Sequence, residues 1–134
     1  MFPKLVIAAF LAAHAAIHAS FIAPRPPVTA GGPAWPFDLT GSWVLSPFGF
    51  DGDVTRLLGI ALIAVTIGGV GLAALAVIGI APAGVWAPAV VAGALSSFAL
   101  IAVFFHPWLV LGMAIDAALI WAVLVADWTP DAVA

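Results

Sequence analysis

The sequence predicts an all-helical integral membrane protein, an up-down-up-down four-helix bundle. Of its 134 residues, 66% are hydrophobic and 7% are charged, with a mean hydropathy of +1.29, whereas a soluble domain carries about a quarter charged residues. Four apolar runs are each long enough to cross a hydrocarbon core about 30 Å thick as a helix. The runs lack the alternation of membrane strands, and backbone in lipid must satisfy its own hydrogen bonds, which favours helices.

The predicted spans cover about residues 3–23, 54–80, 85–105 and 108–128 of a single domain, 1–134. The first run has features of a signal peptide, because Lys4 lies near its start and small residues lie near its end. It is longer than a usual signal-peptide core, and two histidines interrupt it. We therefore interpret it as a true span.

A long loop, residues 24–53, separates the first two spans. Its opening prolines cannot continue a helix. It carries five large aromatic residues, which favour a membrane interface: Trp35, Phe37, Trp43, Phe48 and Phe50. We expect the loop to cover one mouth of the bundle, with a helical turn near residues 39–45 and Asp53 as N-cap of the second span. The alternative is a surface loop that its aromatic residues anchor.

The other two connections, about residues 81–84 and 105–107, are short, so neighbouring helices should be antiparallel. Small residues four apart let helix backbones approach closely. Such pairs are Ala64 with Gly68 and Gly69 with Ala73, and the first span adds Ala8, Ala12, Ala15, Ala16 and Ala19.

Only a few charged residues indicate how the chain is oriented across the membrane. Lys4 favours a cytoplasmic start, whereas Arg25 and Arg56, which flank the long loop, favour the opposite. We expect both termini in the cytoplasm and a location in a bacterial inner membrane, since the alanine- and valine-rich composition is typical of a high-GC bacterium. The lipid bilayer is the expected surroundings. Nucleic acid is not an expected partner, because a net charge of −3 provides no basic face.

Polar residues inside the spans are the candidate site. Counted from the loop end at about 1.5 Å per residue, His14 lies roughly 13 Å deep, Asp116 roughly 12 Å and Thr66 roughly 18 Å. His18 lies one turn from His14 on the same helix face. The expected layer near the bilayer middle consists of His14, His18, Thr66, Ser96, Ser97 and Asp116. The expected mouth residues are His106, Arg56 and Asp53, with His106 starting the fourth span.

An aspartate in the middle of a membrane costs at least about 2.5–3.5 kcal/mol and therefore needs a partner inside the protein. By depth, His14 is the best candidate partner of Asp116, and Ser97 is the alternative for a protonated carboxyl group. The layer has three possible roles. It locks the helices together, it handles protons or cations, or it binds a metal or haem through His14 and His18 with Asp116 or His106.

Enzymatic chemistry has little support, because no hydrolase, zinc-protease, phosphate-loop or dinucleotide motif is present. The absence of cysteine excludes thiolate metal sites and thiol redox chemistry. We expect no cofactor, with haem or a metal ion as the alternative.

The stretch from Leu11 to Phe21, with His14 and His18, together with Ser96 and Ser97, resembles a loose group of small four-span bacterial membrane proteins. That group shows H-x-x-x-H in its first helix, a tryptophan-bearing loop and polar residues in its third helix. The resemblance implies the four-span architecture and no particular activity. From the residues themselves we expect a non-enzymatic accessory or interaction subunit, with another membrane protein or a second copy as partner. A small proton- or cation-coupled transport protein is the alternative.

Overall fold

The computed structural model describes residues 1–23, 26–27, 30–32, 35–50 and 52–132. Four α-helices form it: α1 (Phe2–Ala19), α2 (Asp53–Val77), α3 (Trp86–Val103) and α4 (Val110–Leu124). Single 3-10 turns, η2 (Ala83–Val85) and η3 (Pro107–Leu109), lead directly into α3 and α4. Four segments are long and apolar enough to cross a membrane: Phe2–Ala19, Asp53–Val77, Ala83–Val103 and Pro107–Leu124. No described residue lies in a strand, so the all-helical prediction is confirmed for this part of the chain.

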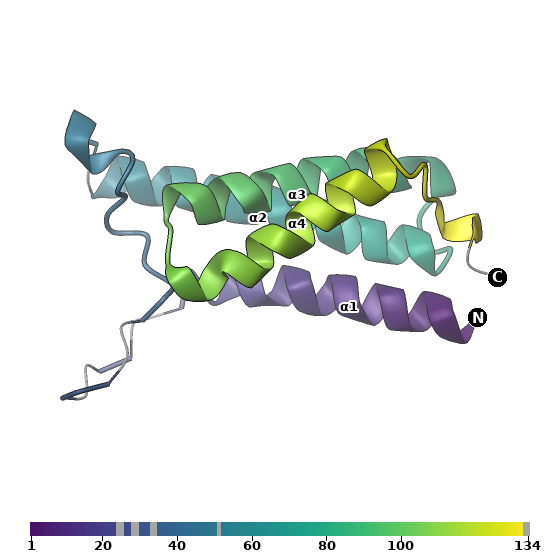
Figure 1. The fold of residues 1–134 in the computed structure, drawn as a ribbon, viewed down its shortest axis with the longest axis horizontal. Helices are drawn as coiled ribbons and strands as arrows, with labels where there is room; N and C mark the ends of the chain where they lie inside the picture. The colour runs from purple at the N-terminus through teal and green to yellow at the C-terminus, as the bar shows by residue number, and fades with distance from the viewer. Residues whose placement is uncertain (24–25, 28–29, 33–34, 51, 133–134) are drawn as a thin grey trace.

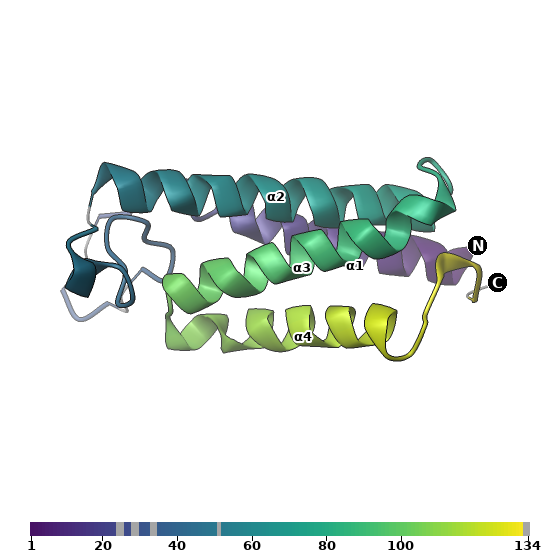
Figure 2. The ribbon, with the colours of Figure 1, turned by 90° about the horizontal axis from the view of Figure 1, so that it is seen from above.

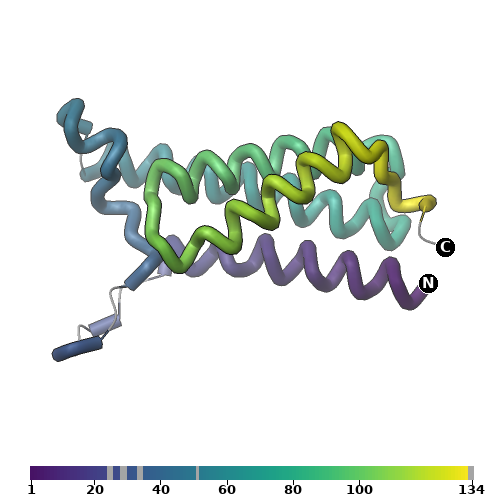
Figure 3. The backbone as a smooth tube through the Cα atoms, in the orientation of Figure 1, coloured from purple at the N-terminus to yellow at the C-terminus, as the bar shows by residue number. Residues whose placement is uncertain are grey.

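The helices lie side by side, and each runs opposite to the one before it (Figures 1 and 2). α2 packs against both α1 and α3, and α3 packs against α4. The two ends of the chain lie at the same end of the molecule, where Lys4 Nζ and Asp131 Oδ1 are 3.8 Å apart. The described part of the long loop lies at the opposite end (Figure 3).

Glycine sets the contact between α2 and α3. A Cβ on Gly69 would lie 2.7 Å from the backbone N of Gly93, and one on Gly93 would lie 2.7 Å from the backbone N of Val70. The two backbones therefore touch, as the Gly69–Ala73 spacing predicts. The other small pair was misassigned, because Ala64 and Gly68 are exposed. The same holds for three alanines of the first span, which lie on its exposed face: Ala12, Ala16 and Ala19.

Two apolar clusters fill the interior. The terminal cluster, at the end that holds both termini, consists of Ala8, Leu11, Ala15, Val70, Ala73, Ala74, Ala76, Val77, Trp86, Ala89, Val90 and Val123. The loop-end cluster consists of Phe21, Leu39, Ile63, Leu100, Ile101, Phe104 and Leu109. Apart from Thr55 near the start of α2, the buried polar residues of the helices lie in sequence between members of the two clusters. A slab of polar side chains thus separates two dry regions.

The loop binds the end of α3. Ser42 Oγ donates to the carbonyl of Val103 at 2.6 Å, and Trp43 Nε1 donates to that of Ala102 at 2.7 Å. Both carbonyls belong to the last turn of α3, where the helix itself offers no donor. These bonds fasten the loop to the bundle.

One local prediction in the loop was wrong, and another was displaced by a few residues. The helical turn expected near residues 39–45 begins at the end of that range, where the N–H of Ser46 donates to the carbonyl of Ser42, and it continues as η1 (Ser46–Phe48), because Pro47 favours the first positions of a helical turn. Gly52 is the N-cap of α2, and Asp53 is instead the first helical residue. The φ of Gly52 is 68°, a left-handed conformation that glycine adopts without the usual cost.

Candidate functional site

Four polar side chains from three helices meet inside the molecule. α1 contributes His14 and His18, α3 contributes Ser97, and α4 contributes Asp116. Their exposed fractions are 5%, 3%, 0% and 0% in that order. Side chains of this kind are stable in an apolar interior only when hydrogen-bonded to one another or to backbone.

The contacts form one connected network. His14 Nε2 lies 2.9 Å from Asp116 Oδ1, and Ser97 Oγ lies 2.5 Å from the second carboxyl oxygen, Oδ2. Ser97 Oγ also lies 2.8 Å from His18 Nε2. His18 Nδ1 lies 2.9 Å from the carbonyl oxygen of His14, one turn earlier in the helix. Both candidate partners of Asp116, His14 and Ser97, therefore contact it.

Hydrogen-bonding chemistry limits where the protons of this network lie. A carbonyl only accepts, so His18 Nδ1 carries a hydrogen. Ser97 has one hydroxyl hydrogen for two neighbours, Asp116 and His18. If Asp116 were ionised and His18 neutral, two acceptors would face each other across the 2.8 Å between Ser97 Oγ and His18 Nε2. That arrangement leaves the contact without a hydrogen, so every contact of the network is satisfied when the network holds one further proton.

Two arrangements satisfy the contacts when His14 Nε2–H donates to Asp116 Oδ1. In the first, Asp116 is ionised and accepts from Ser97, which accepts from a cationic His18. In the second, Asp116 carries the proton on Oδ2 and donates to Ser97, which donates to a neutral His18. The two hold the same number of protons and are neutral in sum. They differ by the passage of one proton between Asp116 and His18 through the Ser97 hydroxyl.

Aromatic rings continue from the network toward the loop. The ring of His18 stacks on Phe21 with centroids 6.0 Å apart, and Phe21 meets Phe37 edge to face at 4.7 Å. Phe37 in turn contacts Trp35, with centroids 5.3 Å apart. The loop is thereby packed against the end of α1 and against the network.

Ser96 and Thr66 are buried in the same slab but do not join the network. Ser96 Oγ donates to the carbonyl of Leu62 in α2 at 2.9 Å. A buried threonine in a helix usually uses the carbonyl four residues earlier, and for Thr66 that is the carbonyl of Leu62. Ser96 and the helical N–H of Thr66 already use its two lone pairs, so the Thr66 hydroxyl is left without a partner.

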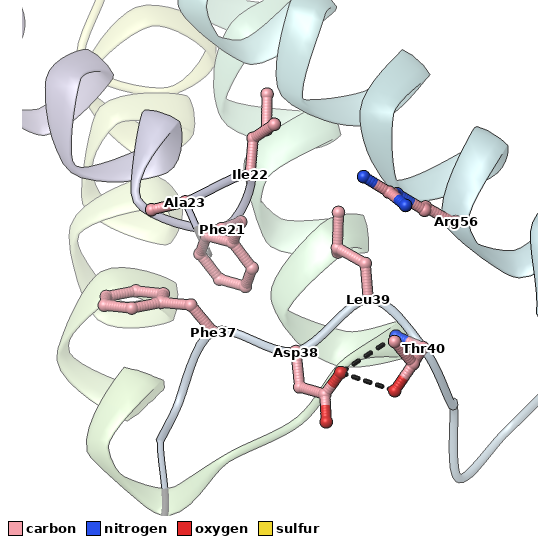
Figure 4. Close-up of a pocket in the computed structure, with 8 residues that line it drawn as sticks. All are labelled: Phe21, Ile22, Ala23, Phe37, Asp38, Leu39, Thr40 and Arg56. Atoms are coloured by element: carbon pink, nitrogen blue, oxygen red, sulfur yellow. Dashed lines mark hydrogen bonds between the residues drawn. The ribbon is translucent and has the colours of Figure 1, made fainter. Parts of the chain in front are cut away.

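The expected mouth residues lie apart from the network. Arg56 is exposed and lines a cavity of about 490 Å³ between the end of α1, the loop and α2, where Asp38 accepts two hydrogen bonds from Thr40 (Figure 4). Among the described residues, Arg56 forms no ion pair with Asp38 or Asp53. Two further charged residues of the loop, Arg25 and Asp51, lie outside the described residues.

His106 immediately precedes the fourth apolar segment, Pro107–Leu124. Its Nδ1 accepts from the backbone N–H of Trp108 at 3.3 Å, and its ring meets the Trp108 indole edge to face at 5.9 Å. The residue is therefore an N-cap of η3.

The two histidines are poorly placed as ligands of one metal ion. Both ring nitrogens of His18 are hydrogen-bonded within the protein, and His14 Nε2 is used by Asp116. Within the described ranges, no three side chains of histidine, cysteine, aspartate or glutamate are grouped as a metal site. A metal or haem would have to replace the network.

One feature that the sequence does not indicate is the contact of Ser97 with His18, which makes the serine a bridge between His18 and Asp116. A second is the indole N–H of Trp35, which is buried without an acceptor.

Comparisons with protein-family models, with curated proteins and with solved structures found no match for this chain.

Proposed function

We propose that this chain is a multi-pass protein of a bacterial inner membrane and serves as a non-enzymatic accessory or interaction subunit. In this proposal the four helices form an up-down-up-down bundle, the loop covers one mouth, and the polar network locks α1, α3 and α4 in register. Lipid provides no hydrophobic force between helices, so packing and hydrogen bonds must hold them together.

The observation that carries the proposal is the closure of the network. Its hydrogen bonds link Asp116, Ser97 and both histidines to one another and to the helix backbone. The terminal cluster beyond it is apolar on all four helices. A lock needs only the closed network, whereas a route across the membrane would also need polar groups through that cluster.

The outer surface supports an interaction role. α1 and α4 expose large apolar side chains, among them Phe10 at 48% and Trp121 at 59%. Such faces suit lipid and a helix of another membrane protein alike. Charged residues that would disfavour either contact are scarce.

Native mass spectrometry after gentle extraction from the native membrane tests this role. We expect the 13.6 kDa chain to carry a further protein mass, either a second copy or another subunit. A bare monomer under conditions that preserve known membrane complexes would contradict the accessory role.

Proton handling is the second candidate, favoured by the two equivalent arrangements of the Asp116–Ser97–His18 chain. Asp116→Asn separates the candidates, because an asparagine oxygen accepts from His14 while its NH₂ donates to Ser97. The lock then survives without a transferable proton. Reconstituted vesicles should show equal proton flux for both forms if the network is only a lock. Flux in the native protein that Asp116→Asn removes, with assembly intact, would favour proton transfer.

A further inference from the structure

The attachment of α1 to α3 and α4 depends on the polar network. Among the four helices, α2 is the one whose backbone lies along α1. α1 reaches the other two through buried polar contacts. His18 Nε2 lies 2.8 Å from Ser97 Oγ of α3, and His14 Nε2 lies 2.9 Å from Asp116 Oδ1 of α4. A change in these contacts therefore changes how α1 is held.

The network is complete only when it holds its further proton. With that proton, a hydrogen lies in each contact that joins Asp116, Ser97 and His18. Without it, the Ser97 hydroxyl has one hydrogen for two accepting neighbours, so one of its two contacts has none. Burial leaves these groups no hydrogen bond with solvent as compensation. Loss of the proton therefore breaks one link of the network.

No other charge within the four helices can take the place of this proton. α3 has no ionisable side chain, and α4 has only Asp116. The further ionisable side chains of α1 and α2 lie near helix ends: Lys4, Asp53 and Arg56. A groove of about 450 Å³ between α1, α4 and the loop borders on both network histidines. Exchange of the proton thus requires no passage through the terminal cluster.

We propose that the network is a pH-sensitive lock on α1. At low pH it holds the further proton and fixes α1 to α3 and α4. As the pH rises, the proton passes to water, one contact of Ser97 loses its hydrogen, and α1 loosens. The contact of Gly69 with Gly93 involves no titratable group, so α2 and α3 stay together. This inference rests on the lock of the proposed function and adds its regulation.

The sign of the pH dependence follows from the number of bound protons. Above about pH 6.5 the separated helices hold no shared proton, because an isolated histidine is then mostly neutral and an isolated aspartate is ionised. The closed network holds one proton more, so stability is highest at low pH and falls as the pH rises. One proton of difference raises the unfolding equilibrium constant about tenfold per pH unit, until the closed network has also released it.

Unfolding of the full chain in mixed detergent micelles, from about pH 6 to about pH 9, tests the proposal. We expect the unfolding equilibrium constant of the native protein to rise about tenfold per pH unit within this range. Asp116→Asn should remove the rise, because its amide donates to Ser97 and completes the network without the further proton. Ser97→Ala should also remove it, because the shared hydroxyl is gone.

Ser96→Ala is the matched control. It should keep the native slope, because Ser96 bonds to the Leu62 carbonyl outside the network. All other ionisable groups are common to the four proteins, so a difference in slope reports the network alone. Circular dichroism establishes that each variant is folded, and the asparagine and alanine variants each suffice if the other does not fold.

Parallel pH profiles of the native protein, Asp116→Asn and Ser97→Ala would overturn the proposal. A native protein that gains stability as the pH rises would overturn it as well. Asp116→Leu tests the lock itself, because a leucine variant as stable as the native protein at every pH would refute both ideas. An unstable leucine variant together with parallel profiles would reject only the regulation.

Amide hydrogen exchange locates the effect. Relative to Asp116→Asn at the same pH, exchange in the native protein should accelerate with rising pH more in α1 than around Gly69 and Gly93. Equal acceleration in both places would contradict the release of α1.

Discussion

The contact between α2 and α3 and the contact between α1 and α4 use opposite means of joining helices. At the first, the backbones of Gly69 and Gly93 touch and leave no room for side chains. At the second, His14 and Asp116 reach across a wider gap, with a groove beside them. The candidate spans of α2 and α3 are 39% and 50% buried, against 28% and 17% for those of α1 and α4.

The difference shows which helix contacts of a small membrane protein can hold polar side chains or a bound molecule. Close backbone packing supplies van der Waals contact along the whole helix but excludes polar groups and ligands. A wider contact loses that packing and must be fixed by hydrogen bonds, which leaves space for a bound molecule. We infer that α2 and α3 are the rigid pair, and that α1 and α4 are held by the network.

Enlarging a glycine of the tight contact should have the largest effect. In Gly93→Leu the new Cβ meets the backbone N of Val70, which cannot move aside, so we expect a loss of about 3 kcal/mol of unfolding free energy. Unfolding in mixed detergent micelles measures it. Gly68→Leu is the control, because nothing lies within 4 Å of its Cβ, and its stability should change by less than about 0.5 kcal/mol. Equal losses would show that α2 and α3 do not touch through Gly93.

Breaking the network should cause the second-largest loss of stability. Asp116→Leu leaves His14 and Ser97 without their carboxyl partner, and we expect a loss of about 1–3 kcal/mol in the same unfolding assay. Asp116→Asn keeps every hydrogen bond and should lose less than about 1 kcal/mol. If the asparagine variant were as unstable as the leucine variant, the charge of Asp116 would matter and not its hydrogen bonds.

Replacing the two neighbouring serines by alanine should reduce stability by different amounts. Ser97→Ala breaks the link between His18 and Asp116 and should cost about 1 kcal/mol. Ser96→Ala should cost only a few tenths of a kcal/mol, because it frees the Leu62 carbonyl for the unpartnered hydroxyl of Thr66. Adding Thr66→Val to Ser96→Ala removes this rescue. A double variant no less stable than the sum of the single changes would refute it.

The smallest effect should follow from loosening the loop. Trp43→Phe removes the bond to the Ala102 carbonyl, but Trp43 is 68% exposed and Ser42 still holds the end of α3. We expect faster amide exchange at the described residues of the loop and a change in global stability below about 0.5 kcal/mol. A loss comparable to that of Asp116→Leu would mean that the loop, and not the network, fixes the bundle.

Composition and span length predicted the four helices well, because lipid leaves a chain few other ways to satisfy its backbone. Counting helix rise also brought Asp116 to the depth of His14, where the structure has it. The same reasoning failed where geometry depends on rotation about the helix axis. It placed Ser96 and Ser97 in one layer without predicting that Ser96 bonds to α2 instead, and it could not separate Gly69 from Gly68, since adjacent residues share a depth but not a face. The position of Trp35 depends on the loop, for which sequence periodicity gives no information.

The most direct test of the single connected network is nitrogen-15 NMR of histidine-labelled protein in bilayers. The chain has three histidines, of which His106 caps η3 away from the network. In Ser97→Ala, which removes the hydroxyl between His18 and Asp116, we predict that the ring resonances of both His14 and His18 shift, while those of His106 stay in place. An unchanged His18 would contradict the account, because the Ser97 hydroxyl would then not connect it to Asp116.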